Sequence, residues 1–358
     1  MTSKERILNA IRGNEIDRVP WSPFLAYYWD HLPAETRAVG EMEYLKQMGA
    51  DPLFRGYGRA YRVEQKNCET VTRQDGRKRY TTHETKVGTL TAEYTYSEKA
   101  NSWFLTGHPV KTAEDFRILQ YMAENQTIVS DAAWLHTDYR GVGGEVLLMP
   151  MLGVNGKTSF QSMVEHWCGT VNLTYALYDF PEVVEECLDV MREKDLETVK
   201  HSAETEVDSF IFWEDSSTTN ISPAMFETYT APQINEWGKI LHANGKLLIH
   251  HACGHLKDLI PAMCRTEIDM IESISPPPTG NIDIKEATAM MPPHIGLIGG
   301  IEPTFFKNCT LDELEVRVYD LLDAMKGKRF VLANSDSCPP HVALEKFKLV
   351  SEIVRRTV

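Results

Sequence analysis

The sequence has no long apolar run. No stretch approaches the roughly 20 consecutive apolar residues that a membrane-spanning helix requires, so we expect no transmembrane segment. Positive charge is also scarce, because 37 Lys and Arg residues face 51 Asp and Glu residues and leave a formal net charge of -14. Nucleic acids and anionic membrane surfaces would repel such a chain, so neither is expected as its main partner.

Features of other protein classes are missing as well. The seven cysteines are odd in number and scattered over 358 residues, which does not suggest the disulfide framework of a secreted protein. The opening MTSKERILNAIRGNEIDRVP lacks the continuous apolar core of a signal peptide and is typical of an amphipathic helix. The stretch MLGVNGKTSF has Met151 where a phosphate-binding loop begins with glycine, so nucleotide binding is not expected. We therefore expect a reduced, cytoplasmic protein.

Short apolar runs rich in β-branched residues alternate with helical patterns along most of the chain. A helical pattern between two such runs is typical of a parallel β–α–β unit, and eight runs are most simply closed into a barrel. The sequence therefore predicts an α/β protein, a (β/α)8 TIM barrel in which residues 1–358 form a single domain. The expected strands lie at 19–25, 51–56, 145–152, 208–214, 246–253, 268–273, 295–300 and 329–335.

One region departs from this alternation. From about residue 57 to 105, polar residues alternate with β-branched or aromatic ones, and the sequences QDGR and KVGT are typical of turns. This pattern predicts antiparallel β-hairpins inserted after the second strand. A doubly wound sheet with a separate β-subdomain is the alternative architecture.

Two side chains of the kind that bind metals lie at the end of the fifth expected strand, in KLLIHHACG. Residues two apart on a strand point to the same side, so His251 and Cys253 share one face and His250 lies on the other. In a barrel, the carboxyl ends of the strands form the active-site rim, and Cys338, directly after the eighth expected strand, would reach it as a third ligand. Two thiolates and an imidazole select zinc over hard cations such as magnesium. Asp336 is expected to orient one of these ligands.

Three segments of the chain resemble the uroporphyrinogen decarboxylase superfamily, namely AIRGNEIDRVPW, ISPAMFETYTAPQINEWGKILHANGKLLIHHACG and FVLANSDSCPPHVALEKFKLV. The His-x-Cys sequence with a distant Cys resembles one branch of it, the zinc-dependent methyltransferases of the aromatic O-demethylase type that work with corrinoid proteins. The resemblance covers nearly the whole chain and implies a TIM-barrel fold. Carried over residue by residue, it implies a zinc site of His251, Cys253 and Cys338.

The chain departs from the decarboxylases at a point that bears on the substrate. Their early arginine motif, which grips the carboxylates of the substrate, should follow the first strand, but SPFLAYYWDHLP holds no arginine there. Decarboxylation of a tetrapyrrole with many carboxylates is therefore not expected. No Asp-x-His-x-x-Gly corrinoid-binding signature occurs either, so the cobalamin would arrive on a separate protein.

The residues at the expected rim favour an aromatic substrate, because aromatic walls suit a flat ring. Glu214 ends the fourth expected strand and is predicted to be catalytic, as a general acid or a zinc ligand that substrate displaces; helix capping is the alternative. Arg55, in the second expected strand, and Glu302, directly after the seventh, are predicted to contact the substrate. The predicted aromatic contacts, at or just after the end of the first strand, are Trp21, Phe24, Tyr27, Tyr28 and Trp29.

Two methyl-transfer reactions fit the implied site. In the favoured one, zinc acts as a Lewis acid on the oxygen of an aromatic methyl ether, so that a Co(I) corrinoid can take the methyl group. In the alternative, zinc lowers the pKa of a thiol, which takes methyl from methylcobalamin. A decarboxylase-like enzyme and a non-catalytic barrel that carries a corrinoid or tetrapyrrole are further alternatives. We therefore expect Zn²⁺ in the protein and cobalamin on a partner corrinoid protein. The oligomeric state is left open, with a homodimer as one option.

Overall fold

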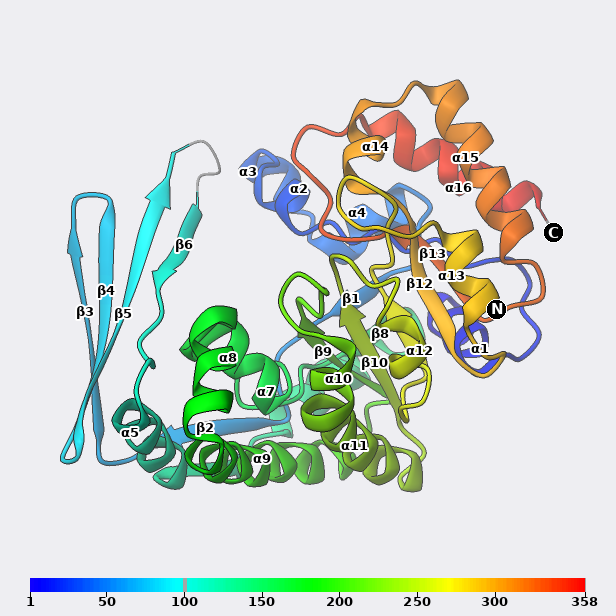
Figure 1. Cartoon of the computed structure of the whole chain (residues 1–358). Helices are drawn as coiled ribbons and strands as arrows, with labels where there is room; N and C mark the ends of the chain where they lie inside the picture. The colour runs from blue at the N-terminus through cyan, green and yellow to red at the C-terminus, as the bar shows by residue number, and fades with distance from the viewer. Residues whose placement is uncertain (99–101, 358) are drawn as a thin grey trace. The chain divides into compact units, whose positions relative to one another are not determined.

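The computed structural model describes residues 1–98 and 102–357 (Figure 1). The described chain divides into two compact units. The first comprises Met1–Arg59, Ala133–Met151 and Thr205–Val358, and the second comprises Ala60–Ala132 and Leu152–Glu204. That the whole chain folds as a single domain stays a prediction.

Parallel strands with helices between them make up the centre of the first unit (Figure 1). The strands are β1 (Leu53–Arg55), β8 (Leu147–Met149), β9 (Ser209–Glu214), β10 (Leu247–Ala252), β11 (Met270–Glu272), β12 (Gly296–Ile301) and β13 (Phe330–Asn334). In the described part of the chain, one sheet has the order β13-β12-β11-β10-β9, and a second sheet pairs β1 with β8. Single parallel bridges join Trp21 to Leu332 and Met151 to Ile211.

These strands overlap seven of the eight predicted runs. The first run, 19–25, contributes a bridge at Trp21 and no longer strand in the described residues. The reason is that Pro20 and Pro23 have no N–H to donate to a neighbouring strand. The mixed α/β class is confirmed, while closure of all eight runs into one barrel stays a prediction.

A buried apolar core lies on one face of these strands. Ile211 and Ile249 point from their strands into this core, and Ile7 and Ile11 of the first helix pack in the same core. Thr2 caps that helix, because its side chain accepts a hydrogen bond from the N–H of Glu5 at 3.2 Å. The helices of the first unit are α1 (Ser3–Arg12), α2 (Tyr27–Asp30), α3 (Ala34–Arg37), α4 (Glu41–Gln47), α6 (Ala133–Val142), α10 (Pro223–Met225), the π-helix η2 (Phe226–Thr230), α11 (Ala231–Ala243), α12 (Ile260–Met263), α13 (Ile284–Met290), α14 (Pro303–Asn308), α15 (Leu311–Ala324) and α16 (Leu344–Arg356).

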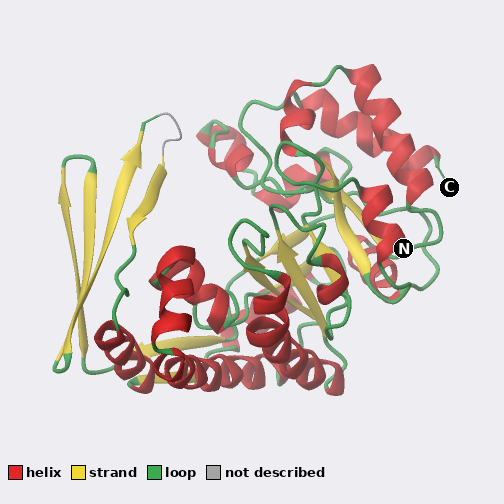
Figure 2. Cartoon of the chain, in the orientation of Figure 1, coloured by secondary structure: helices red, strands yellow, loops and turns green. Residues whose placement is uncertain are grey.

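The second unit combines antiparallel strands with helices. Its strands are β2 (Tyr61–Gln65), β3 (Cys68–Asp75), β4 (Lys78–Thr85), β5 (Gly88–Ser97), β6 (Ser102–Gly107) and β7 (Gln126–Ser130). Figure 2 shows β3, β4, β5 and β6 side by side as an antiparallel sheet, and β2 pairs antiparallel with β7. Its helices are α5 (Ala113–Glu124), α7 (Ser159–Ser162), the π-helix η1 (Met163–Trp167), α8 (Gly169–Asp179) and α9 (Pro181–Ala203).

Antiparallel strands thus occupy the stretch for which hairpins are predicted, except that residues 99–101 lie outside the described residues. Their place as an insertion after the second strand of a barrel stays a prediction. Among the described residues, none of the helices combines the length and the apolar character needed to cross a bilayer.

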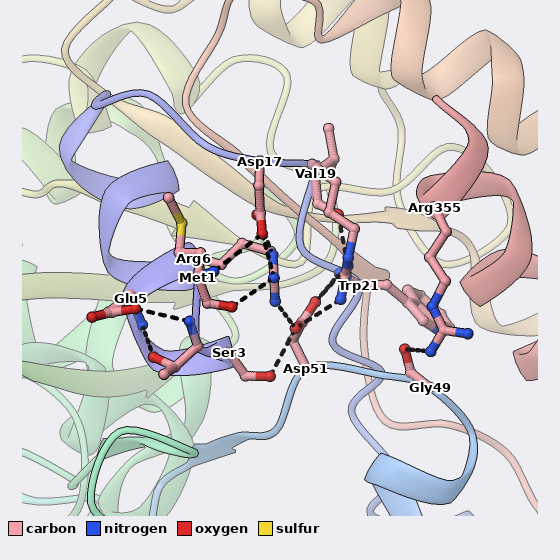
Figure 3. Close-up of polar contacts among 12 residues, drawn as sticks. Met1, Ser3, Glu5, Arg6, Asp17, Val19, Trp21, Gly49, Asp51 and Arg355 are labelled. Carbon is pink, nitrogen blue, oxygen red and sulfur yellow. Dashed lines mark hydrogen bonds and ion pairs between the residues drawn. The ribbon is translucent and has the colours of Figure 1, made fainter. Parts of the chain in front are cut away.

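A buried carboxylate ties the start of the chain to β1 (Figure 3). The side chain of Asp51 is fully buried and accepts hydrogen bonds from Arg6 Nη1 at 2.6 Å and Arg18 Nη1 at 2.8 Å. It also accepts from Ser3 Oγ at 2.9 Å and from the N–H of Trp21 at 3.1 Å. Because these groups come from α1 and from the segment that follows it, Asp51 fixes both against the strand that it precedes.

We expect Asp51→Asn to lower the free energy of unfolding by at least ~3 kcal/mol, because it leaves two largely buried arginines without their shared counter-charge. Urea unfolding followed by circular dichroism would measure this. Asp17→Asn is the matched control, since Asp17 also pairs with Arg6 but its side chain is 41% exposed, and a change below ~1 kcal/mol is expected. Equal losses in the two variants would contradict the central place given to Asp51.

Candidate functional site

The strand β10 positions two ligand-type side chains at its carboxyl end. Ile249 faces the core, so strand alternation places His251 on the same face and His250 on the opposite one. Cys253 is the first residue after the strand. Its N–H donates to the carbonyl oxygen of Glu214 on β9 at 3.3 Å, which fixes the backbone where β10 ends.

Three potential metal ligands lie together at this point. A ring nitrogen of His251, the Sγ of Cys253 and a carboxylate oxygen of Asp336 are all within 4.8 Å of one another. Asp336 follows β13, so the chain brings the group together from two strands of one sheet. Imidazole, thiolate and carboxylate are the ligand types of zinc, and three of them leave a position for substrate, as catalytic zinc sites do. The donor chemistry of these residues therefore fits a zinc ion.

A buried carboxylate holds the imidazole of His251. Its Nδ1 lies 3.1 Å from Oε2 of Glu272 on β11, and Glu272 also pairs with Nε of Arg55 on β1. Burial acts to raise the pKa of Glu272, but the charge of Arg55 and the hydrogen bond with His251 outweigh it, so this pKa lies below its usual value. With Nδ1 engaged, Nε2 of His251 is the nitrogen left for a metal ion, an arrangement common among metal-binding histidines.

The surroundings of His251 also favour its protonated form in the metal-free protein. Burial acts to lower its pKa, but hydrogen bonds with Cys253 and Glu272 and the charges of Glu272 and Asp336 outweigh burial and raise the pKa to about 10. Because only a neutral imidazole binds a metal ion, metal binding must release this proton.

Cys338, the predicted third ligand, lies outside this group of donor atoms. Its N–H donates to the carbonyl oxygen of Phe24 at 2.9 Å, and its own carbonyl accepts from the N–H of Tyr28 at 2.9 Å. The thiol is fully buried, and burial raises its pKa well above the usual range. Asp336, expected only to orient a ligand, has its carboxylate among the donor atoms instead. Zinc binding by Cys338 stays a prediction.

Glu214 points away from the donor group. Trp213 packs against the core, so its neighbour Glu214 lies on the opposite face of β9. There its fully buried carboxylate lies 3.0 Å from Nε2 of His250 and accepts from Ser216 Oγ at 3.0 Å. A catalytic role for Glu214 stays a prediction. From this position its side chain does not reach the donor group, and Glu214 contacts Cys253 only through its backbone carbonyl oxygen.

An aromatic-walled cavity of about 350 Å³ lies in the same unit. A row of three rings connects this cavity with the donor group. The ring centroids of Phe24 and Trp213 are 5.9 Å apart, and those of Trp213 and His251 are also 5.9 Å apart. A larger cleft of about 1110 Å³, lined by residues such as Gly13 and Lys328, holds none of the predicted site residues. The aromatic residues that line the smaller cavity are Phe24, Trp29, Phe54 and Tyr57.

The cavity contains charged groups of both signs. Arg55 lines it and donates from Nη2 to the carbonyl oxygen of Ser22 at 3.0 Å, while its buried Nη1 has no hydrogen-bond partner among the described residues. Burial raises the pKa of Glu41, the charge of Asp30 raises it further, and Arg55 acts against both. The cavity is thus lined by a largely buried guanidinium and by one carboxyl group that is more readily protonated than usual.

The other predicted substrate residues lie elsewhere. Trp21 is fully buried in the core, and Tyr28 is buried with its hydroxyl 2.9 Å from that of Tyr44. Tyr27 is 61% exposed, and Glu302 caps the first turn of α14. None of these four residues lines the aromatic cavity. Trp21 and Tyr28 are packed in the interior, Tyr27 faces solvent, and Glu302 caps a helix.

Phe24, Trp29 and Arg55 are therefore the predicted substrate residues that the structure places at the cavity. The sequence reasoning missed Phe54 and Tyr57, although both flank Arg55 at the end of the second predicted strand, where the rim was expected. No local pattern marks Glu41, which lies at the start of helix α4.

A solved structure shares this fold. A methyltransferase from Methanosarcina mazei aligns with 100% of this chain and 99% of its own, with a TM-score of 0.64 and 15% sequence identity. A B12-independent methionine synthase from Shewanella sp. W3-18-1 aligns with 95% of this chain and 98% of its own, at a TM-score of 0.49 and 10% identity. The first likeness shows that the chain has a mixed α/β fold, whose structural neighbours are of the TIM-barrel type.

The sequence places the chain in a family. The uroporphyrinogen decarboxylase (URO-D) family matches residues 104–357, most of the chain, so the protein belongs to this family. The uroporphyrinogen decarboxylase of Synechococcus sp. (strain CC9902) is 26% identical over 121 residues. That match covers 33% of this chain and 32% of the relative, so the chain aligns with about a third of that enzyme. The resemblance to the superfamily is thereby confirmed.

The stability of the metal-free protein is expected to depend on pH through His251. Its folded-state pKa of about 10 lies above the ordinary 6.5, so its protonation stabilises the fold fully below pH 6.5, and this contribution is lost as the pH rises to about 10. After chelation, urea unfolding across this range should show a falling free energy of unfolding. The fall should be smaller in His251→Gln, and an equal fall in both proteins would overturn the assignment.

Proposed function

We propose that the protein is a zinc-dependent methyltransferase that moves a methyl group from an aromatic methyl ether to the Co(I) corrinoid of a separate protein. One observation carries the proposal: the donor atoms of His251, Cys253 and Asp336 lie near an aromatic-walled cavity that Arg55 also lines. The likeness to the Methanosarcina mazei methyltransferase supports methyl transfer as the type of reaction.

His251 and Cys253 would hold the zinc ion, with a third ligand from the segment after β13. The resemblance implies Cys338 for this place, and the carboxylate of Asp336 lies within reach of the same atoms. When bound, zinc would supply Lewis acidity at the ether oxygen. Glu272 keeps the imidazole of His251 oriented, as partners of metal-binding histidines do.

The cavity residues would bind and orient the substrate. Phe24 and Phe54 line the cavity and would pack against the ring of an aromatic ether. Arg55, which also lines the cavity, would place its positive charge beside an oxygen on that ring. In the net reaction the methyl C–O bond breaks and its electron pair stays on the phenolate oxygen. The electron pair of Co(I) forms the new bond to the methyl carbon.

A carboxyl group at the cavity could then protonate the phenolate. Glu214 is the residue predicted for this role, but its carboxylate lies on the far face of β9, bonded to His250. Glu41 lines the cavity itself, and burial together with the charge of Asp30 raises its pKa above the ordinary value, which favours the protonated form that a proton donor needs. We therefore assign the proton donor to Glu41 and an indirect, positioning role to Glu214.

Metal analysis of single variants tests the ligands. Substitution of His251 or Cys253 by Ala should abolish stoichiometric zinc. Because zinc prefers thiolate to carboxylate in mixed sites, Cys338→Ala should lose most of the zinc and Asp336→Asn should keep it. Far-UV circular dichroism controls for folding. The opposite result for the last two variants would transfer the third-ligand role to Asp336, and full zinc in all variants would reject the site.

An assay with a methoxylated aromatic compound and a reduced corrinoid protein tests the reaction. It should produce methyl-Co(III) and the matching phenol. Phe24→Ala should raise KM by about 10-fold, the scale of one lost aromatic contact, without loss of zinc. Tyr27→Ala is the matched control and should behave as wild type, because Tyr27 faces solvent. Turnover of methylcobalamin with small thiols, and of no methoxyarene, would establish the thiol methyltransferase instead.

A further inference from the structure

The strand β3 forms an open edge of the antiparallel sheet in the second unit. It pairs with β4 on one side, and no described strand pairs with its other side. Seven of its eight residues, from Glu69 to Asp75, are exposed, and its register with β4 runs without a bulge from Cys68 to Asp75. The sequence CETVTRQD holds no proline, and the charged side chains on this edge are Glu69, Arg73 and Asp75. An edge of this kind is a template for another strand.

The hairpin turn determines which backbone groups of β3 are available. Asp75 and Lys78 are register partners across the two-residue loop that begins with Gly76, whose φ is 57°. Such a turn is closed by hydrogen bonds between its flanking residues, and the pattern alternates along an antiparallel ladder. Counting back from Asp75, Thr70 and Thr72 therefore point their N–H and C=O groups away from β4, toward the open side.

The same strand is complementary to itself in one antiparallel register. Two copies of β3 related by a two-fold axis at Val71 place Thr70 opposite Thr72 of the other copy, so both exchange the backbone groups that point outward. This register also places Glu69 opposite Arg73 of the other copy, twice. A shift of the register by two residues in one direction places Glu69 opposite Asp75, so that two negative charges meet. A shift by two residues in the other direction places Glu69 opposite Val71, so that the attractive pair is lost. The register centred on Val71 is therefore the favourable one.

Two charged residues of β3, Glu69 and Arg73, have no partner of opposite charge in the part of the chain that the structure describes. In the described residues, neither Glu69 nor Arg73 makes an ion pair with a side chain of the same molecule. Glu69 instead lies opposite Glu84 on β4, a like charge, and the guanidinium of Arg73 lies over the ring of Tyr80 at 5.5 Å. A neighbouring strand that supplies both missing partners would relieve this arrangement.

We propose that β3 pairs antiparallel with β3 of a second copy of this chain, about a two-fold axis at Val71, so that the sheet continues from one molecule into the other. The contact is isologous, as in most homodimers, and uses strand addition at a sheet edge. It lies on the antiparallel sheet of the second unit and shares no residue with the candidate metal site. Its success or failure is therefore independent of the proposed function.

Charge exchange on β3 tests the register. Sedimentation velocity over a concentration series should show a monomer–dimer equilibrium for wild type. Glu69→Arg and Arg73→Glu should each weaken dimerisation at least ~10-fold, because each replaces two attractive cross-strand pairs by two repulsive ones. An equimolar mixture of the two variants should form a heterodimer, since every pair across the axis is then opposite in charge. Wild type that stays monomeric, or single variants that dimerise as wild type does, would overturn the proposal.

A cysteine trap tests the axis directly. Val71 would face itself in a pair without hydrogen bonds, where Cα atoms are about 4.5 Å apart, a distance that a disulfide spans. Oxidised Val71→Cys should therefore run as a covalent dimer on a non-reducing gel. Thr72→Cys is the matched control, because its side chain lies on the other face of the strand and away from the axis. Thermal melting confirms that both variants fold. Absence of the Val71→Cys dimer, or equal cross-linking of both variants, would reject the axis.

Discussion

The candidate site depends on one buried ion pair, between Arg55 of β1 and Glu272 of β11. Taking both charges out of water is unfavourable unless each is paired and hydrogen-bonded, and this requirement determines the surrounding contacts. Glu272 meets it with Arg55 and with Nδ1 of His251, and Arg55 meets it in part with the carbonyl oxygen of Ser22. The pair therefore holds the imidazole of His251 beside Cys253 and holds the guanidinium of Arg55 at the edge of the aromatic cavity. It thus links the group of donor atoms to the cavity.

Much of the fold could be predicted because the physical signals are local. Parallel strands covered on both faces are continuous apolar runs, and such runs coincide with β9, β10 and β13. Alternation along KLLIHHAC also suffices to place His251 and Cys253 together, as the group of donor atoms confirms. The prediction of a strand at 19–25 was wrong beyond the single bridge at Trp21, and the reason is again local, since Pro20 and Pro23 interrupt the hydrogen bonding of this run.

The remaining parts of the site depend on contacts that local sequence does not contain. The run SFIFWE is apolar on both faces, so nothing within it tells whether Trp213 or Glu214 faces the core. The choice between Asp336 and Cys338 depends on how the loop after β13 is held by a segment at the other end of the chain. The cavity likewise forms from pieces that approach only in the folded state, which is why Glu41 carried no signal.

The contact between the two ends of the chain has a consequence for biosynthesis. Phe24, which forms one wall of the cavity, is held by the side chain of Asn334, which lies 310 residues later. At roughly 5–20 residues per second, a ribosome needs on the order of 15–60 s to make the intervening chain. Arg55 and Trp213, which contact the ring of Phe24, are made before that interval ends. The backbone of Phe24 gains its hydrogen bonds with Asn334 only when almost the whole chain has been made.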